Sequence, residues 1–440
     1  MKFKVVKFGG SSLADAHQFQ RVKNIVLSDK GRRYVVVSAP GKRFEEDRKV
    51  TDLLFDCYHL AENEQPIDDI FAQIESRFYH IVNGLSLDFN LSDEFTKIKL
   101  AIQHNAGRDY VASRGEYLCG LLLAEYLGYD FIDPLRYVCF RDDGTFDQEV
   151  TNEKLKSVLS QHEYAVIPGF YGSMPNGTIK TFSRGGSDIT GSIVARAAMA
   201  DVYENWTDVS GFLMADPHQI DHPKNIEVIT YHELRELSYM GATVLHEDAI
   251  FPVRYAGIPV HIRNTNHPQD KGSLIVASTD VESKYVITGI AGKKGFSIIA
   301  IEKEMMNTEI GFGKRVLSVL ERHNICFEHL PSGIDTMSVL LQTSSLNEAR
   351  DVIIKELCKD IDPQTIYIED HIALIAVVGR GMVKAKGTAA KIFTALAEAD
   401  INIKMIDQGS SELNIIIGVE EKDFTRALNS IYDAFVKESR

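Results

Sequence analysis

The stretch Lys7-Phe8-Gly9-Gly10-Ser11-Ser12 closes an apolar strand at residues 3–8 and opens a helix that runs to about residue 27. Two glycines let backbone N–H groups approach an oxygen atom closely, and a helix N-terminus adds partial positive charge. Lys7 places a full positive charge beside them. The stretch therefore predicts a phosphate-binding turn, with an ordinary strand-to-helix turn as the alternative.

Length, charge and cysteine spacing limit the classes of protein to consider. The 440 residues are too many for one core and predict two or three domains. The formal net charge of -14 argues against a nucleic-acid or anionic-membrane partner. The longest apolar run, residues 372–378, is too short to span a bilayer. The five cysteines are widely spaced, so neither a disulfide framework nor a zinc site is indicated, and we expect a reducing cytoplasm.

The first 280 residues alternate apolar strands with helical patterns, which predicts an α/β sandwich with a mostly parallel sheet. Residues from about 52 to 110 are rich in helix formers and carry no site motif, so they are expected to form a helical insertion. Strands are expected at residues 3–8, 34–37, 165–167, 179–181, 202–206 and 260–263. Helices are expected up to residue 27 and at residues 51–127, 187–200 and 232–256.

The C-terminal third contains an internal repeat. Residues 311–341 align without a gap on residues 387–417, so that a helical pattern is followed in both copies by an expected strand, at 325–329 and 401–405. A period this long indicates two copies of a small βαβ-type domain rather than a solenoid. We therefore expect a first domain at 1–280 and a C-terminal region at 284–440, with units at about 296–365 and 371–440.

Polar residues stand at the end of a second strand and at the start of two helices. Ser38 ends a strand, where doubly wound sheets place their ligands. Thr51 follows the charged loop of residues 42–50, and Glu116 precedes an apolar helix. Each of these positions, taken alone, is more simply explained as a turn or as a helix cap that offsets the dipole.

The segment Thr181-Phe182-Ser183-Arg184-Gly185-Gly186-Ser187-Asp188 is a sharper signal, because it lies between a strand and an apolar helix. Its glycines and hydroxyl groups predict a second anion-binding turn, and Arg184 offers a planar fork suited to a carboxylate. Asp188 is suited to orient Lys7 or a magnesium ion held by phosphates, with an N-cap as the alternative. Asp208 closes another strand after Thr207, where it can accept bonds from a nucleotide, or simply form a turn.

These motifs, in the order in which they follow one another along the chain, resemble those of aspartokinases. The resemblance covers essentially the whole chain. The resemblance implies an amino-acid-kinase-type α/β/α sandwich followed by two α+β ACT-type (βαββαβ) domains, and the insertion is similar to that of the monofunctional, lysine-sensitive type. It implies transfer of the γ-phosphoryl group of Mg²⁺·ATP to the β-carboxylate of L-aspartate, the first step of lysine, threonine and methionine biosynthesis. That carboxylate is already ionised at pH 7, so the task is to align two anions and offset their charge.

The resemblance also implies roles for individual residues, by position. The ATP phosphates would be held by Lys7, Phe8, Gly9, Gly10 and Ser11, and the rest of the nucleotide would be contacted by Thr207 and Asp208. Aspartate would be held by Thr51, Glu116 and Arg184, with Glu116 pairing its ammonium group and Arg184 a carboxylate. Lys7, Asp188 and Ser38 would be the catalytic residues at the reacting phosphate.

Three positions depart from the pattern of better-known aspartokinases. Leu213 stands where a nucleotide-contacting tyrosine is expected, His218 where an arginine is expected, and Thr243 where a lysine is expected. These departures suggest one alternative to an aspartate kinase, a non-catalytic amino-acid sensor with a decayed kinase domain. A second alternative is a kinase whose acceptor is another amino acid or small carboxylate.

The duplicated C-terminal units resemble ACT domains, which bind small amino acids at domain interfaces and commonly form dimers. The turn at Gly311, Phe312 and Gly313 precedes a helix and is suited to receive an effector carboxylate, while Ser332 and Asp335 are candidates to meet its amino group. Tight turns in a small fold are the alternative for each residue. The resemblance implies feedback inhibition, by lysine first and threonine second, and a homodimer or homotetramer.

Overall fold

The computed structural model describes residues 2–183, 185–241, 247–280, 284–347 and 349–437. The chain forms two compact units, which we describe separately. The first unit contains residues 1–212, 225–231 and 244–279, and the second contains residues 213–224, 232–243 and 280–440. Two segments that precede residue 280 in the sequence therefore belong to the C-terminal unit.

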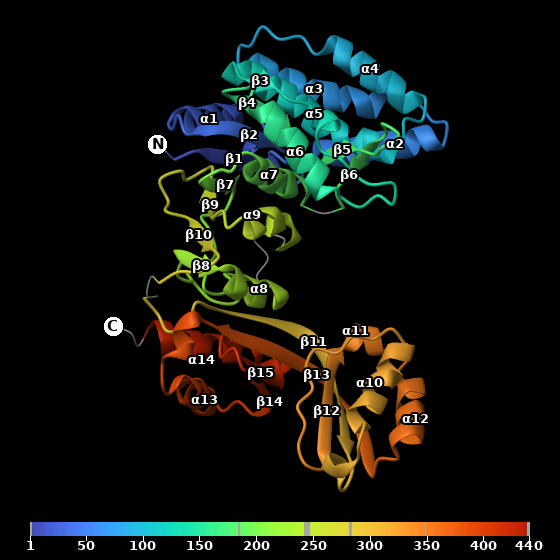
Figure 1. Ribbon diagram of the computed structural model, residues 1–440, viewed down its shortest axis with the longest axis vertical. Helices are drawn as coiled ribbons and strands as arrows, with labels where there is room; N and C mark the ends of the chain where they lie inside the picture. The colour runs from blue at the N-terminus through green and yellow to red at the C-terminus, as the bar shows by residue number, and fades with distance from the viewer. Residues whose placement is uncertain (1, 184, 242–246, 281–283, 348, 438–440) are drawn as a thin grey trace. The chain divides into compact units, whose positions relative to one another are not determined.

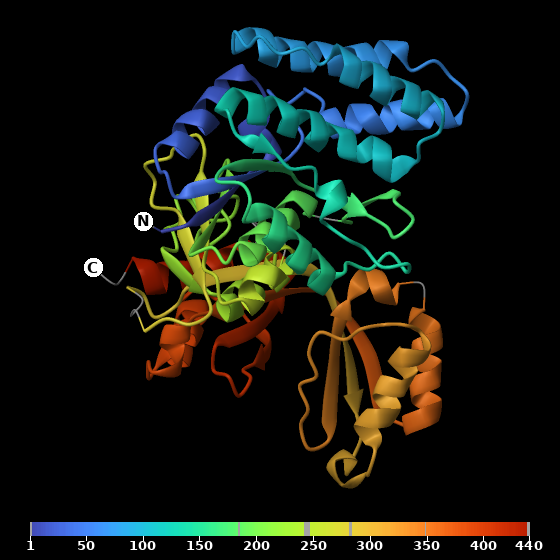
Figure 2. The ribbon, with the colours of Figure 1, turned by 45° about the horizontal axis from the view of Figure 1, so that its top comes forward.

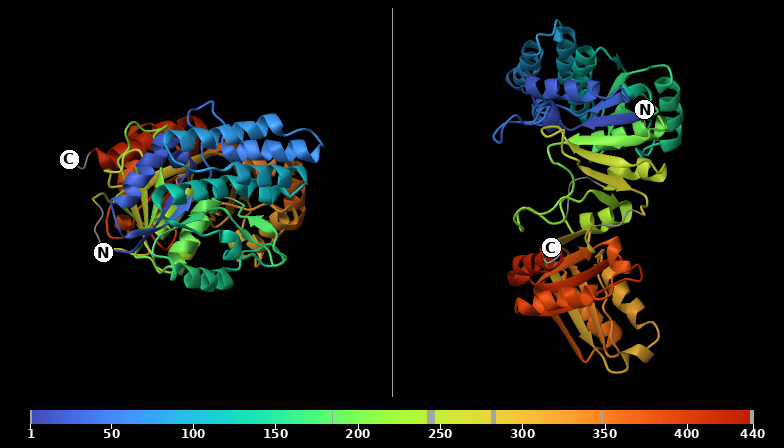
Figure 3. Two further views of the ribbon diagram at one scale, coloured as in Figure 1. Left: turned by 90° about the horizontal axis from the view of Figure 1, so that it is seen from above. Right: turned by 90° about the vertical axis from the view of Figure 1, so that its left-hand side faces the viewer.

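An eight-stranded sheet forms the centre of the first unit, in the order β3-β4-β2-β1-β7-β9-β10-β8 (Figure 1). Of its neighbouring pairs only β9 and β10 are antiparallel, which confirms the mostly parallel sheet. The right-hand view of Figure 3 shows blue β1, green β7 and yellow β9 one beneath another. The strands are β1 (Lys4–Phe8), β2 (Arg32–Val37), β3 (Asp130–Phe131), β4 (Ala165–Pro168), β7 (Val202–Thr207), β8 (Val228–Thr230), β9 (Val260–Asn264) and β10 (Ser273–Val276).

Strand β1 lies between β2 and β7, and its residues from Val5 to Phe8 are buried. Burial on both faces is typical of a parallel sheet covered by helices. Successive side chains point to opposite faces, so Phe8 stacks on Trp206 with ring centroids 6.0 Å apart while Lys7 points to the other face. The carboxyl ends of β1, β2 and β7 meet at one edge of the sheet, which places the motifs that follow them side by side.

The face of the sheet that carries Trp206 also holds a buried ion cluster. Glu204, 1% exposed, pairs with Arg32 (Nε to Oε2, 2.8 Å) and with Lys4 (Nζ to Oε1, 2.8 Å). The indole Nε1 of Trp206 donates to Glu204 Oε2 at 2.9 Å. Burial alone would raise the pKa of Glu204, but Arg32 and Lys4 outweigh it and lower the pKa. The cluster therefore keeps a charged carboxylate inside the sheet.

Residues 51–127, predicted as one helical stretch, form four helices that lie side by side (Figure 2). Pro66 separates the first two, and Gly107, with φ +86°, precedes the last, because neither residue continues a helix. The predicted helix at 232–256 is likewise divided, after Gly241 with φ +106°. The helices of this part of the chain are α1 (Ala16–Leu27), α2 (Val50–Glu62), α3 (Asp68–Gly84), α4 (Ser92–Gln103), α5 (Arg108–Leu127), α6 (Gln148–Leu159), α7 (Gly186–Ala197), α8 (Tyr231–Tyr239) and α9 (Phe251–Tyr255).

The predicted strand at 179–181 forms outside the main sheet. β6 (Ile179–Thr181) pairs only with β5 (Tyr171–Ser173), in a two-stranded antiparallel ribbon. Short 3-10 helices complete the first unit: η1 (Gly10–Leu13), η2 (Pro134–Arg136) and η3 (Glu247–Ile250).

A five-stranded antiparallel sheet forms the second unit, in the order β12-β11-β13-β15-β14. β11 (Gly289–Glu302) and β13 (Thr365–Val378) run through both halves of this sheet. The start of β11 pairs with the end of β13, beside β15, and after bulges between Lys293 and Ile298 the rest of β11 pairs with β12. The two halves share continuous strands, and the prediction of ACT-type α+β domains is confirmed.

The helix that the internal repeat predicts in each copy forms as α10 and α13, and each packs on a second helix beyond the aligned residues. α10 and α12 pack together in the first half of the unit, and α13 and α14 pack together in the second (Figure 1). The remaining elements are β12 (Thr336–Gln342), β14 (Ile403–Asp407), β15 (Asn414–Glu420), α10 (Phe312–Arg322), α11 (Thr343–Leu346), α12 (Arg350–Ile361), α13 (Thr388–Glu398), α14 (Phe424–Val436), η4 (Met306–Thr308), η5 (Arg380–Val383) and η6 (Glu421–Asp423).

One strand prediction in the repeat is wrong. Residues 325–329 form no strand and reach β12 only through an isolated bridge between His329 and Leu340. Pro331 lies two residues beyond and has no N–H to donate, so a ladder hydrogen bond is missing between this bridge and the bridge of Ser332 with Met337. The equivalent segment of the second copy has no proline and forms β14.

Segments 213–224 and 232–243 are tied to the sheet of the second unit. Ile290 in β11 donates its N–H to the Met214 carbonyl oxygen at 2.7 Å. Glu233 in α8, with no exposed surface, pairs with Arg380 (Oε2 to Nη1, 3.0 Å) and accepts a hydrogen bond from Thr288 at 2.5 Å. A backbone bond and a buried ion pair thus fix these segments to the five-stranded sheet.

Candidate active site

Lys7 and Asp188, both expected site residues, form a close ion pair. The Lys7 Nζ lies 2.6 Å from Asp188 Oδ1, in the first turn of α7, and Lys7 is only 6% exposed. Asn205 on β7 donates its Nδ2 to the same oxygen at 2.8 Å. We did not predict Asn205, although a buried asparagine in an apolar strand, two residues before Thr207, was an available signal.

The glycine turn after β1 packs backbone against backbone on the loop after β2. The Gly41 N–H donates to the Gly10 carbonyl oxygen at 2.8 Å, and the Ser38 N–H donates to the Phe8 carbonyl oxygen at 3.2 Å. A Cβ built on Gly10 would lie 2.8 Å from the Ala39 oxygen, and one on Gly41 would lie 2.6 Å from the Gly10 carbonyl carbon. Only glycine fits at these two positions, so the turn and the Ser38 loop form one closely packed pair.

Other groups of the turn are used to fix it to the sheet. The Gly9 N–H donates to the Trp206 carbonyl oxygen at 3.0 Å, and the Ser12 N–H donates to the Gly9 oxygen at 3.0 Å. The Ser12 hydroxyl lies 2.7 Å from the Thr265 hydroxyl, in the loop after β9. These contacts anchor the turn at both of its ends.

Glu116 is a buried carboxylate in α5 beside the same loop. Burial raises its pKa to about 8, against the opposing effects of a hydrogen bond from the Ala39 backbone and of the nearby Arg114 and Lys7. Its Oε2 atom is buried and meets no donor among the described residues. A buried polar atom without a partner is costly, and a ligand that brings a donor removes that cost.

The other expected site residues lie at strand ends and helix starts. Asp208 is exposed after β7, where its carboxylate accepts a hydrogen bond from Thr207 and its carbonyl oxygen accepts one from Asn264. Thr51 is half-buried in the first turn of α2. Arg184 and Thr243 lie outside the described residues. The structure thus brings Lys7, Asp188 and the Ser38 loop together, with Thr207 at the end of the neighbouring strand.

The nucleotide-side departures fall on a segment of the second unit. Leu213 is half-buried, and His218 is exposed with its Nδ1 atom 2.9 Å from an Asp216 carboxylate oxygen. Metal-ligand clusters and membrane-spanning helices are both absent from the described parts of the chain. No three His, Cys, Asp or Glu side chains gather there where they could hold a metal ion. None of the helices that the structure describes has the length and apolar character needed to cross a bilayer.

The expected effector residues surround one end of the first ACT-type half. Asp335 accepts hydrogen bonds from the Lys303 N–H through its carbonyl oxygen and from the Met305 N–H through its carboxylate, at 2.8 and 2.9 Å. Ser332 forms a bridge with Met337. A Cβ built on Gly313 would lie 3.6 Å from Met337 Cε, while Gly311 caps α10 with φ +79° and Phe312 is buried. The turns at residues 303–313 and 332–337 are therefore neighbours.

Comparison with known proteins agrees with this architecture. The amino acid kinase family matches residues 2–264, and an ACT domain family matches residues 375–435. Aspartokinase 3 of Bacillus subtilis (strain 168) is 41% identical over 454 residues, which cover 98% of each chain. The amino acid kinase match and the Bacillus subtilis relative both extend across the site described above.

Solved structures give the same result. The crystal structure of Clostridium acetobutylicum aspartate kinase is 52% identical, has a TM-score of 0.90, and covers 99% of this chain and 100% of that chain. Aspartokinase III of E. coli in complex with aspartate and ADP is 26% identical, with a TM-score of 0.72, over 98% of this chain and 99% of that chain. The same enzyme in complex with lysine and aspartate, also 26% identical, covers 99% of this chain. The chain belongs to the aspartokinases, members of the amino acid kinase family, as the order of its motifs predicted.

Proposed function

We propose that the site around Lys7 and Asp188 transfers the γ-phosphoryl group of ATP to the β-carboxylate of L-aspartate, giving 4-phospho-L-aspartate. The observation that carries the proposal is the buried Lys7–Asp188 pair at the carboxyl ends of parallel strands, directly beside the Gly10–Gly41 contact. The complex of the related E. coli enzyme with aspartate and ADP supports these substrates.

ATP would lie across the glycine turn. The Gly9 and Ser12 N–H groups are already bonded within the fold, so the phosphate oxygens would be received by the Gly10 and Ser11 N–H groups and by the Lys7 ammonium. Phe8 contributes the strand end from which the turn starts. Thr207 and Asp208, at the end of the neighbouring strand, would contact the rest of the nucleotide.

Aspartate would lie on the side of Glu116. The unpartnered Oε2 of Glu116 would accept a hydrogen bond from the substrate ammonium group, which supplies the donor that the described residues lack. Thr51 and Arg184 would hold the substrate carboxylates, because a guanidinium fork matches a carboxylate in shape and charge. Ser38 would lie at the reacting phosphate.

The chain needs no general base for this reaction, because the acceptor carboxylate is ionised at neutral pH. Its residues would align the two anions in one line and offset the charge that spreads over the transferring group. Lys7 would supply fixed positive charge, and Asp188 with Asn205 would hold the Lys7 ammonium in place.

The donor set fits a magnesium ion carried by ATP rather than one held by the protein alone. Magnesium prefers one or two carboxylates completed by phosphate oxygens and water, and the described residues contain no cluster of three ligands. Asp188 is the carboxylate that would hold it. When bound, the ion would offset charge on the β- and γ-phosphates.

The C-terminal unit would act as a feedback sensor for an end-product amino acid. The complex of E. coli aspartokinase III with lysine supports lysine first, and threonine is the second candidate. Gly311, Phe312, Gly313, Ser332 and Asp335 would form the effector site. Inhibition requires that the effector bind one of two conformations more tightly than the other.

The exposed apolar side chains Phe327 and Ile334 support assembly into a homodimer or homotetramer through the ACT-type domains. The five cysteines are free thiols, which is consistent with a reducing cytoplasm. Lysine, threonine and methionine biosynthesis would be the pathway supplied.

The experiment that tests the proposal measures ADP release from Mg²⁺·ATP with and without L-aspartate, across a titration of lysine and a separate titration of threonine. Aspartate-dependent release that lysine suppresses would support both halves of the proposal. Release that only threonine suppresses would keep the kinase and change the effector. Absence of aspartate-dependent release would favour the non-catalytic sensor and overturn the proposed reaction.

A further inference from the structure

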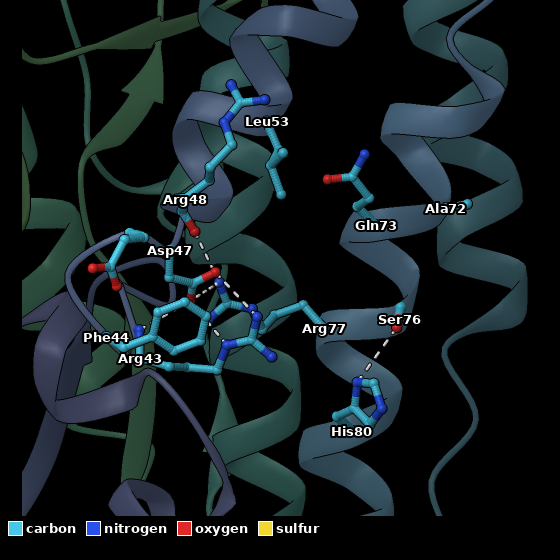
Figure 4. A pocket seen from close by; sticks show the side chains of 11 residues that line it. Arg43, Phe44, Asp47, Arg48, Leu53, Ala72, Gln73, Ser76, Arg77 and His80 are labelled. Carbon is cyan, nitrogen blue, oxygen red and sulfur yellow. Dashed lines mark hydrogen bonds and ion pairs between the residues drawn. The ribbon is translucent and has the colours of Figure 1, made fainter.

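Arg77 lies on α3, among the inserted helices and far in sequence from every site motif. Its side chain is only 4% exposed, and its guanidinium group makes four hydrogen bonds. Nη1 donates to the carbonyl oxygens of Ala14 (3.2 Å) and Gly41 (3.1 Å). Nη2 donates to Asp47 Oδ2 (2.6 Å) and to the Arg48 carbonyl oxygen (2.8 Å) (Figure 4). One buried side chain thus connects three separate segments of backbone.

Each of these segments leads to a residue of the proposed site. Ala14 directly follows the glycine turn that would hold the ATP phosphates. Gly41 donates its N–H to Gly10 of that turn. Arg48 lies three residues before Thr51, which would hold aspartate. Arg77 therefore bonds to the backbone on both the nucleotide side and the acceptor side.

We propose that Arg77 is a positioning residue for phosphoryl transfer, which holds the loop of residues 41–48 against the glycine turn and so sets the geometry of the turn relative to Thr51. The inference rests on the proposed function and extends it to the inserted helices. Arg77 touches neither the proposed ATP-binding residues' side chains nor the reacting groups. It acts through backbone carbonyl groups.

The glycine turn and the loop of residues 41–48 are in close contact, so the position of the loop determines the position of the turn. A Cβ on Gly41 would already lie within 2.8 Å of the Gly10 oxygen and the Ser11 nitrogen. A small shift of the loop must therefore either break the Gly41–Gly10 hydrogen bond or push the turn. Misplacing reacting groups by a fraction of an ångström to 1 Å is enough to slow a reaction that depends on alignment.

A planar guanidinium is suited to this task in a way that lysine is not. Its two terminal nitrogens diverge, so each can serve two acceptors at once, whereas an ammonium group is a single compact point of charge. The pKa of Asp47 is held well below its usual range by the Arg43 side chain, with Arg77 contributing, so this acceptor stays charged. The four acceptors of Arg77 are thus fixed by backbone or by a permanent charge.

Arg43 provides a matched control on the same carboxylate. Its Nε donates to Asp47 Oδ2 at 2.8 Å and its Nη2 donates to Asp47 Oδ1 at 3.0 Å. Its side chain is 36% exposed, and among the described residues it makes no hydrogen bond to Gly41 or Ala14. Replacing Arg43 removes positive charge beside Asp47 and leaves the hydrogen bonds from Arg77 to Ala14 and Gly41 in place.

A surface pocket gives access to the Arg77 position. It has a volume of about 440 Å³ and is lined by Arg77 together with Arg43, Phe44, Asp47, Arg48 and His80 (Figure 4). A small guanidinium compound could enter it and occupy the space left when Arg77 is truncated. Chemical rescue is therefore a feasible test of position.

The test compares Arg77→Ala, Arg77→Lys and Arg43→Ala with the wild-type chain, by steady-state ADP release and by thermal unfolding. Both Arg77 variants should raise the KM for ATP and for aspartate and lower kcat, with kcat/KM reduced about tenfold or more. Methylguanidinium, well below concentrations that unfold the chain, should restore part of the activity of Arg77→Ala. Arg43→Ala should keep the wild-type kinetic constants.

Two outcomes would overturn the inference. One is Arg77 variants with wild-type kinetic constants per mole of folded protein, even if they unfold at lower temperature. The other is an Arg43→Ala variant with the same kinetic defect. If Arg77→Ala does not fold, Arg77→Lys decides the question alone. Failure of the proposed function would be recognised separately, because the wild-type chain would then release no ADP in response to aspartate.

Discussion

Lys7 and Asn205 share one acceptor, the Oδ1 atom of Asp188, so the carboxylate oxygen that holds the active-site ammonium is itself fixed by a second donor. An aimed charge stabilises a transition state better than a mobile one, because it requires no reorganisation during the reaction. We therefore expect Lys7, Asp188 and Asn205 to contribute unequally to catalysis, and substitutions can measure the difference.

Replacing Lys7 should remove turnover while leaving the fold intact. Lys7→Ala deletes the fixed positive charge at the phosphates, and we expect kcat to fall by about a thousandfold or more. Asn205→Ala keeps that charge and removes only the second donor to Asp188, and we expect a fall of about tenfold. Aspartate-dependent ADP release, with circular dichroism as the folding control, measures both. Equal effects of the two substitutions would contradict the assignment.

Aspartate binding should improve as the pH rises. Burial raises the pKa of Glu116 to about 8, so below that pH the free enzyme carries a neutral carboxyl group that must lose its proton to pair with the substrate ammonium. The KM for aspartate should therefore fall between about pH 6 and pH 8 and then level off. Glu116→Gln should bind aspartate weakly and show no such slope. A flat profile for the wild-type chain would argue against the role of Glu116.

The same carboxyl group should affect stability with the opposite trend. Because the pKa of Glu116 is higher in the folded chain than in the unfolded chain, the folded state binds more protons between about pH 4.5 and 8. The free energy of unfolding of the wild-type chain should therefore decrease over this range relative to Glu116→Gln. Denaturant unfolding of both chains at several pH values measures the difference.

Adding one methyl group at Gly41 should disrupt the site from a distance. The new Cβ would lie 2.6 Å from the Gly10 carbonyl carbon, so the glycine turn must move. We expect Gly41→Ala to lower kcat/KM for ATP by about tenfold to a hundredfold. Gly409→Ala is the control, because a Cβ there meets no atom within 4 Å. Steady-state kinetics of the two variants measure the effect. Wild-type kinetic constants for Gly41→Ala would show that the contact between the turn and the loop tolerates a shift.

The buried ion cluster behind β1 should contribute to stability rather than to catalysis. Arg32→Ala leaves the carboxylate of Glu204 inside the sheet without its main partner, and we expect the free energy of unfolding to fall by about 3–5 kcal/mol. Arg33→Ala, on the same strand but bonded to an exposed carbonyl group, should lower it by about 1 kcal/mol or less. Denaturant unfolding measures both values.

The sequence allowed good prediction of those features that depend on local pattern. The mostly parallel sheet and the two copies of a small C-terminal domain followed from apolar strands, helix-start motifs and an ungapped repeat, and the ACT type followed from the resemblance. The strand at 325–329 was predicted wrongly because its apolar residues match those of the other copy, while Pro331 removes a donor just beyond them. The helical stretch at 51–127 was divided by Pro66 and Gly107, whose effect on continuity we did not weigh.

In the candidate site, too, residues that belong to sequence motifs were predicted and residues placed by packing were missed. Lys7 and Asp188 belong to recognisable motifs, and the structure places them in contact. Arg77 belongs to none, because an arginine on an amphipathic helix is most simply a surface residue, and its four acceptors come from segments distant in sequence. Asn205 was missed for a related reason, since its partner is set by the packing of α7 on the sheet.

The membership of segments 213–224 and 232–243 in the C-terminal unit has a consequence for protein engineering. A chimera that exchanges the C-terminal region at the boundary seen in the sequence would be cut near residue 280. Such a chimera would separate Glu233 from its native Arg380 and Met214 from Ile290, leaving a buried acid to face an unrelated sheet. A chimera that is to fold like the wild-type chain should therefore exchange residues 213–224 and 232–243 together with the C-terminal region, as one discontinuous unit.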